Sequence, residues 1–126
     1  MPMPDPHVLL ATDSADPSGL GRHMLTLARG LAASGWRVTL AFPEAAAAFV
    51  AAARAEGGEA QDFADPDSLL ARLRPGLVHI HAGIGWEGQG LARAAAAAGL
   101  PAIRTEHLPW LITDPGQEAD YAAAAA

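Results

Sequence analysis

Two histidines near the end of a short apolar segment are the residues of this sequence best suited to chemistry. His79 and His81 alternate with apolar residues over 77–82, and Gly83 and Gly85 follow directly. Side chains two residues apart on a strand point to the same side of a sheet, so both imidazoles would face one surface. At the carboxyl end of a parallel strand, such a ring can contact a ligand. We expect this of His81, and we expect His79, deeper in the strand, to belong to the core.

A second motif, Ser18-Gly19-Leu20-Gly21-Arg22, precedes a predicted helix. Glycines there allow backbone N–H groups to approach a phosphate, and the helix dipole favours an anion. The motif is not a dinucleotide fingerprint, because Met24 replaces the third glycine and no acid ends the following strand. The chain has no lysine, which excludes the common phosphate loop. A flexible loop before a helix is the alternative interpretation.

Further polar and aromatic residues follow predicted strands. Asp13 comes after the first strand, and it could instead cap a turn. Glu106 and His107 end the last strand, where ordinary surface polarity is the alternative. Trp86 lies in the loop after His81 and could stack on a sugar or simply pack.

The elements that must position these residues alternate along the chain. Alternating strands and helices indicate βαβ units and a parallel sheet. The commonest strand order, 3-2-1-4-5, would bring loops 13–22 and 82–88 together where the strand order reverses. The predicted strands are 7–12, 36–42, 59–63, 77–82 and 101–107, and the predicted helices are 20–34, 44–56, 65–74, 88–98 and 117–126.

Composition limits the classes of function. The 126 residues form one domain, and 51% of them are apolar without any run long enough to span a membrane. A net charge of −6 argues against nucleic acid as a partner. The absence of cysteine excludes disulfides and thiolate metal sites and fits a cytoplasmic protein.

Three motifs, taken in order, resemble the N-terminal domain of GT-B fold, family 4-like retaining glycosyltransferases. They are Asp13 with the Gly19-Leu20-Gly21-Arg22-His23 run, the Arg-Pro-Gly-Leu-Val-His-Ile-His-Ala-Gly run over 74–83, and Arg-Thr-Glu-His-Leu-Pro-Trp over 104–110. The family usually has a Gly-Gly pair where this chain has Gly-Leu-Gly. The resemblance implies an α/β, Rossmann-like, three-layer domain with a parallel sheet of about five strands. It also implies transfer of a sugar, of the hexosyl type, from a nucleotide-sugar to an acceptor hydroxyl with retention, as in carbohydrate biosynthesis.

The resemblance assigns roles to the candidate residues. His81 would be catalytic and contact the donor sugar. Gly19 and Gly21, with Arg22 nearby, would approach the donor diphosphate. No metal or other cofactor is expected, because positive groups and a helix dipole stabilise the leaving diphosphate in this family. The acceptor side would be formed by Asp13, Trp86, Glu106 and His107.

The resemblance also suggests a domain organisation. Residues 1–126 would be the acceptor-side domain, incomplete at its C-terminal end, in a truncated N-terminal half of a GT-B enzyme. The donor-binding domain would be missing, so we expect the chain to be inactive alone. The apolar loop 108–112 permits a lipid-linked acceptor and peripheral membrane contact, at the inner face of the membrane.

Two other classes of function stay open. One is a stand-alone, non-catalytic module that binds a sugar or an anionic ligand. The other is a histidine metal protein in which the two strand histidines act with Glu106 or His107, although no His-x-x-x-His or thiolate pattern supports it.

Overall fold

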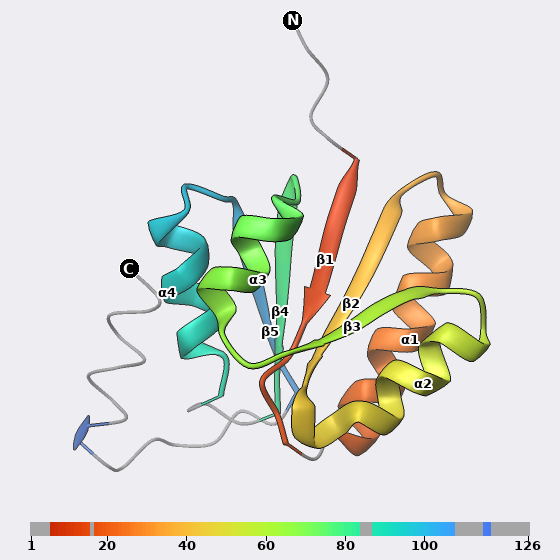
Figure 1. The fold of residues 1–126 in the computed structure, drawn as a ribbon, viewed down its shortest axis with the longest axis horizontal. Coiled ribbons are helices and arrows are strands. Elements are labelled where there is room, and N and C mark those ends of the chain that lie inside the picture. The colour runs from red at the N-terminus through yellow and green to blue at the C-terminus, as the bar shows by residue number, and fades with distance from the viewer. Residues whose placement is uncertain (1–5, 16, 84–86, 108–114, 117–126) are drawn as a thin grey trace, which may run out of the picture.

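The structure, a computed structural model, describes residues 6–15, 17–83, 87–107 and 115–116. In these residues strands alternate with helices along the chain (Figure 1). The strands are β1 (His7–Ala11), β2 (Arg37–Pro43), β3 (Glu59–Phe63), β4 (Leu77–Ala82) and β5 (Ala102–Glu106). The helices are α1 (Ser18–Ala33), the short 3-10 helix η1 (Glu44–Ala46), α2 (Ala47–Ala55), α3 (Pro66–Leu73) and α4 (Gln89–Ala97).

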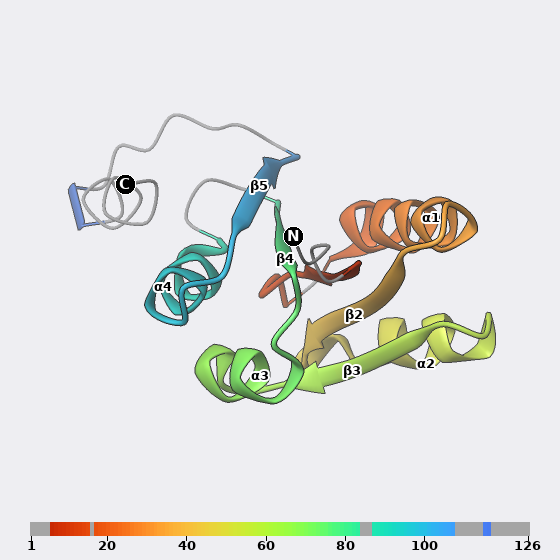
Figure 2. The same ribbon diagram turned by 90° about the horizontal axis from the view of Figure 1, so that it is seen from above.

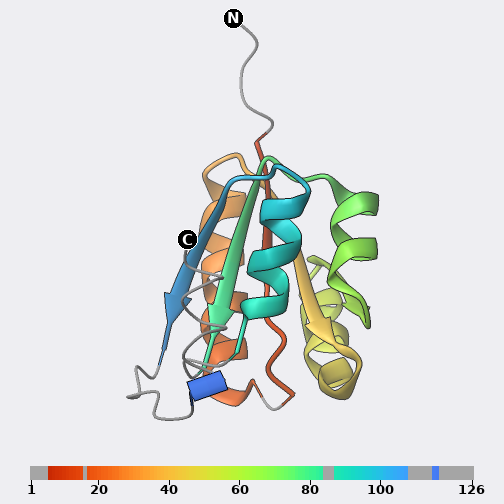
Figure 3. The same cartoon turned by 90° about the vertical axis from the view of Figure 1, so that its left-hand side faces the viewer.

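The five strands form one parallel sheet in the order β3-β2-β1-β4-β5, which confirms the predicted order. Strand β1 lies in the middle and pairs with both β2 and β4. Because the strands are parallel, their carboxyl ends lie at one edge of the sheet, the lower edge in Figure 3. The loops after β1 and β4 therefore leave the sheet side by side, as the strand order requires.

Helices cover both faces of the sheet and give three layers (Figure 2). Val8 and Leu10 pack with α1 and α2, whereas Leu9 and Ala11 pack with α3 and α4. All five residues of β1 are buried. A strand buried on both faces reads as a continuous apolar run, which is why 7–12 was recognisable in the sequence.

The first helix begins earlier than predicted, at Ser18 and not at Leu20. Gly19 and Gly21 therefore lie in the first turns of α1 and not in a loop. The Gly21 N–H donates to the Pro17 carbonyl at 2.7 Å, so it is already used within the chain. A Cβ at Gly21 would overlap the Phe49 ring, whereas a Cβ at Gly19 would meet nothing. Gly21 thus permits close packing of α1 on Phe49.

Other boundaries within the described residues agree with the prediction to within a few residues, whereas the predicted helix 117–126 and the apolar loop 108–112 lie outside the described residues. Strands β3 and β4 have the predicted bounds, while β2 and β5 differ from theirs by one residue at each end. The predicted helix 44–56 is divided into η1 and α2. The Asp65 carboxylate caps α3 by accepting from the amides of Asp67 and Ser68 at 3.3 Å. None of the described helices combines the length and the apolar character required to cross a bilayer.

A polar network occupies the amino end of the sheet. His7 is buried in β1, and its Nε2 lies 2.8 Å from the Thr39 hydroxyl. Thr39 donates to Glu59 at 3.1 Å, and Glu59 accepts from Arg37 at 3.2 Å on the surface. The hydrogen bond from Arg37, and after it the one from Thr39, lowers the pKa of the Glu59 carboxyl. This network connects a buried imidazole to solvent through successive partners.

Candidate functional site

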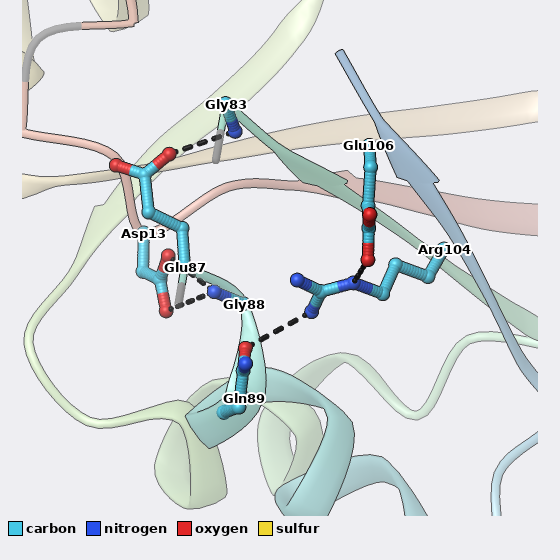
Figure 4. Close-up of polar contacts among 7 residues, drawn as sticks. All are labelled: Asp13, Gly83, Glu87, Gly88, Gln89, Arg104 and Glu106. Carbon is cyan, nitrogen blue, oxygen red and sulfur yellow. Dashed lines mark hydrogen bonds and ion pairs between the residues drawn. The ribbon is translucent and has the colours of Figure 1, made fainter. Parts of the chain in front are cut away.

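At the carboxyl edge, an aspartate connects the loop after β1 to the start of α4. Both carboxylate oxygens of Asp13 accept from the Gly88 N–H, at 2.8 and 3.0 Å (Figure 4). Gly88 is the N-cap of α4 and has φ +84°. A Cβ there would lie 2.7 Å from Nη1 of Arg104 and 2.9 Å from Cγ2 of Ile80. Both its conformation and its surroundings therefore require glycine at this position.

The Asp13 carboxyl has a raised pKa. Burial is the main cause, and the negative charge of Glu87 adds to it, while the Gly88 hydrogen bond and Arg104 act in the opposite direction. The hydrogen bonds therefore offset only part of the cost of desolvating this carboxylate. Asp13 is held in place at an energetic cost, which is common at functional sites.

The loop between β4 and α4 is closed by a second carboxylate. Oε1 of Glu87 accepts from the Gly83 N–H at 2.7 Å (Figure 4). Residues 84–86 lie outside the described part of the chain, so the predicted role of Trp86 stays a prediction. Asp13 and Glu87 together fix both ends of this loop.

An arginine on β5 organises the α4 side of the same edge. Arg104 donates through Nη1 to Gln89 at 3.1 Å and through Nε to Glu106 at 3.2 Å (Figure 4). Glu106 is thus engaged in an ion pair on the α4 face. His107 follows β5 and contacts the histidines on the α1 face, so the strand separates the two residues that we had placed together on the acceptor side.

Four histidines gather at the carboxyl edge, on the side of the sheet covered by α1. Nδ1 of His81 lies 3.1 Å from Nε2 of His107. His23, on α1, lies across from this pair, with ring centres 5.7 Å from His81 and 5.0 Å from His107. The ring centre of His79 lies 4.0 Å from that of His81, with the rings tilted by 33°, and Nε2 of His79 is 2.8 Å from the Thr105 hydroxyl. The two strand histidines share one surface, as the sequence spacing predicted.

Three of these imidazoles, those of His79, His81 and His107, have a lowered pKa. Burial, and after it His79, His107 and His23, lowers the pKa of His81 to about 3. Burial also lowers the pKa of His79 and of His107. His81 is therefore neutral at pH 7 and presents a hydrogen-bonding group without a positive charge.

His81 also has an unusual hydrogen-bonding state. The residue is 0% exposed, and among the described residues its Nε2 has no hydrogen-bond partner. A buried nitrogen without a partner costs about 1–3 kcal/mol, so such atoms are rare in folded proteins. A group that is costly in the free protein is a candidate for completion by a ligand.

A hollow of about 300 Å³ lies at the amino end of the sheet between α1 and α2. Aliphatic side chains of α1, β2 and α2 line part of it, together with Trp36 and four charged residues, Arg29, Arg37, Glu56 and Glu59. Arg37 and Glu59 form an ion pair with each other. Among the described residues of its lining, no buried side-chain polar atom is left without a hydrogen-bond partner, unlike at the carboxyl edge. We therefore assign the candidate site to the carboxyl edge, which holds Asp13 with Gly88 at the start of α4 and the histidines on the side covered by α1.

Comparison with known proteins identifies the family of the chain. Residues 17–124 match the family described as Glycosyltransferase Family 4. The chain belongs to glycosyltransferase family 4. A solved structure, described as a crystal structure analysis of the glycotransferase of kitacinnamycin, has the same fold, with a TM-score of 0.55 at 18% identity. That match covers 94% of this chain, which spans 37% of the length of that glycotransferase. No curated protein matches the sequence significantly.

Of the residues predicted for this family 4 site, the structure brings some together and separates others. His81, His107 and Asp13 all lie at the carboxyl edge. Arg22 is exposed on α1, next to His23. Glu106 lies at the same edge but is paired with Arg104.

Sequence reasoning missed several residues of this family 4 domain. No role is predicted for His23, although it ends the Gly19-Leu20-Gly21-Arg22-His23 run; its signal is its place one turn into the first helix. Gly88 was used only to mark a loop. Arg104 and Gln89 gave no signal, because their pairing depends on the distance between α4 and β5 and not on spacing in the sequence.

Proposed function

We propose that this domain forms one side of the active site of a retaining glycosyltransferase that uses a nucleotide-sugar donor. His81 contacts the donor sugar. The observation that carries the proposal is its ring, which is buried and neutral and has one nitrogen without a partner among the described residues. A neutral imidazole with an N–H can donate to a sugar hydroxyl, and the bond would remove the cost of the unpaired nitrogen.

The start of α1 is the proposed place of the donor diphosphate. Pro17 is its N-cap and offers no side-chain cap, so the first amides of this 16-residue helix have no helical partner. Such amides, together with the helix dipole, favour a phosphate group. Arg22 is exposed one turn further and adds a positive charge. This arrangement supports transfer without a metal cofactor.

A donor-binding domain would complete the site opposite the carboxyl edge, which extends the domain organisation expected from the sequence. Asp13, with its loop, and His107 would face a sugar or lipid-linked acceptor. The enzyme would be of the hexosyltransferase type. We further propose a cytoplasmic location with peripheral contact at the inner membrane face, where a lipid-linked acceptor would be presented.

The experiment is a transfer assay on the complete product of the gene, with a panel of nucleotide-sugars and release of the nucleotide as the readout. His81→Ala is expected to reduce transfer about a hundredfold, as loss of one donor to a reacting centre does. His7→Ala is the matched control, because it removes a buried histidine from the neighbouring strand at the other end of the sheet. A wild-type rate in His81→Ala would refute the role of His81. Tight donor binding without any transfer would favour the non-catalytic module.

A further inference from the structure

We propose that His23, His81 and His107 form a binding site for a zinc ion. The three residues come from α1, from the end of β4 and from the residue after β5, so the fold brings them together from three separate segments. Each ring offers one nitrogen, and these three nitrogens all lie within 4.8 Å of one another. These distances are a property of the protein alone, so zinc binding does not depend on the proposed transfer reaction.

The spacing of the rings fits one tetrahedral ion. The ring centres are 5.0, 5.4 and 5.7 Å apart. Imidazoles bound to one zinc ion have ring centres about 5 Å apart, because each Zn–N bond is about 2 Å long. Two ligand nitrogens on such an ion lie about 3.3 Å apart, and Nδ1 of His81 lies 3.1 Å from Nε2 of His107. The ion can therefore take the place of the hydrogen bond between these rings with small shifts of the side chains.

The chemical state of the rings also suits a metal. Zinc binds neutral imidazole, which coordinates through one nitrogen and keeps its proton on the other. Burial lowers the pKa of both His81 and His107, which favours the neutral imidazole that zinc binds. His23 is exposed, which gives the ion a path from solvent and leaves this ring free to adjust.

Other potential metal ligands at this edge already have hydrogen-bond or ion-pair partners, which leaves three imidazoles for the ion. Nε2 of His79 is bonded to Thr105, Asp13 accepts from Gly88, and Glu106 is paired with Arg104. Three imidazoles then hold the ion, and the fourth position is left for water, a pattern that zinc accepts. If the proposed function is correct, zinc would occupy His81 and inhibit transfer.

The test is equilibrium dialysis of the full chain, without a polyhistidine tag, against buffered Zn²⁺. One zinc ion per chain is expected for the wild type. Removing even an outer partner of a zinc ligand weakens binding about 10–100-fold, so His23→Ala and His107→Ala should each weaken it at least tenfold. Arg22→Ala is the matched control, because it changes an exposed neighbour of His23 on the same helix and should bind as the wild type does. With Co²⁺ as the probe, the visible absorption of a tetrahedral site should appear in the wild type and in Arg22→Ala only.

Zinc affinity that is unchanged in both His23→Ala and His107→Ala would overturn the proposal, as would the absence of a stoichiometric ion in the wild type. His23 is exposed, so its substitution is expected to leave the fold intact, which circular dichroism can check. The dialysis contains no nucleotide-sugar. A failure of the transfer assay therefore leaves the zinc result standing, and a failure of zinc binding leaves the transfer proposal standing.

Discussion

The two ends of the sheet each hold a buried histidine, and the two residues are in opposite states. His7, at the amino end, is 2% exposed, and His81, at the carboxyl end, is 0% exposed. His7 bonds to Thr39 and is connected through it to a surface ion pair. Nδ1 of His81 lies within hydrogen-bond distance of another imidazole, whereas its Nε2 has no hydrogen-bond partner among the described residues.

The carboxylates repeat this contrast. Glu59, at the amino end, has a lowered pKa because Arg37 and Thr39 stabilise its charge. Asp13, at the carboxyl end, has a raised pKa because burial outweighs its hydrogen bonds. One end of the sheet satisfies its polar groups and stabilises the fold. The other keeps a partly buried carboxyl with a raised pKa and a buried nitrogen without a hydrogen-bond partner among the described residues, a state that is common at functional sites.

The largest expected effect concerns two glycines with the same backbone conformation. Gly88 has φ +84° and Gly57 has φ +85°, but a Cβ would meet Arg104 and Ile80 at the first and nothing at the second. Gly88→Ala should lower the free energy of unfolding by about 3 kcal/mol, from left-handed strain plus overpacking. Gly57→Ala should cost only about 1 kcal/mol. Urea denaturation measures both, and equal losses would show that the carboxyl edge is not the more tightly packed end.

The two buried histidines give the next effect. His7→Ala should lower the free energy of unfolding by about 2–3 kcal/mol, because it leaves a cavity and removes the partner of Thr39. His81→Ala should cost about 1 kcal/mol less, because it also removes a nitrogen that has no partner. Thermal unfolding with a chelator present compares the two variants. A larger loss for His81→Ala would contradict the contrast between the two ends.

A smaller effect tests whether packing or phosphate binding requires Gly21. Gly21→Ala should destabilise the chain by about 1–2 kcal/mol, because its methyl group would overlap the Phe49 ring. Gly19→Ala, in open space on the same helix, should be neutral or stabilise by up to about 1 kcal/mol. Chemical denaturation of both variants gives the answer. If Gly21→Ala is as stable as wild type but binds donor less tightly, its role is in ligand binding.

The smallest effects are those of pH on the two carboxylates, and they have opposite signs. The pKa of Asp13 is higher in the folded protein than in the unfolded chain, where it has its ordinary value of 3.8. The folded state therefore binds the proton more tightly, and wild type should lose stability relative to Asp13→Asn as the pH rises above 3.8. Glu59 binds its proton less tightly when folded, so wild type should lose stability relative to Glu59→Gln as the pH falls below 4.5. Unfolding curves at several pH values measure both trends, and the same sign for both would remove the distinction between the two ends.

Much of this fold could be predicted from the sequence, because its signals are local. The apolar runs at 7–12 and 77–82 are typical of strands buried on both faces, and Asp65-Pro66 is a clear helix start. The spacing of His79 and His81 correctly placed both rings on one surface. The start of α1 was wrong by two residues, because glycine is a weak indicator of where a helix begins.

The site was less predictable, because its decisive relations are long-range. Nothing in the spacing of His23 and His107 shows that α1 brings them to His81. Glu106 and His107 lie on opposite faces because side chains alternate along a strand. To predict this from the sequence, the end of the strand would have to be known to one residue. The hydrogen bond of Asp13 depends on the conformation of Gly88, which only the assembled sheet defines.

The bond between Asp13 and Gly88 joins residues 75 positions apart, and this determines when the carboxyl edge can exist during folding. Closing such a long loop costs entropy before the contact repays it. Strands β1 to β3 with their two helices are complete once Phe63 has been synthesised, whereas the edge needs β4, α4 and β5 as well. We expect the Thr12 amide, bonded to Ala41, to gain protection from hydrogen exchange before the Gly88 amide in a pulse-labelled refolding experiment. Simultaneous protection would mean that the two halves of the sheet assemble in one step, so that the chain never exists with a finished scaffold and an unformed site.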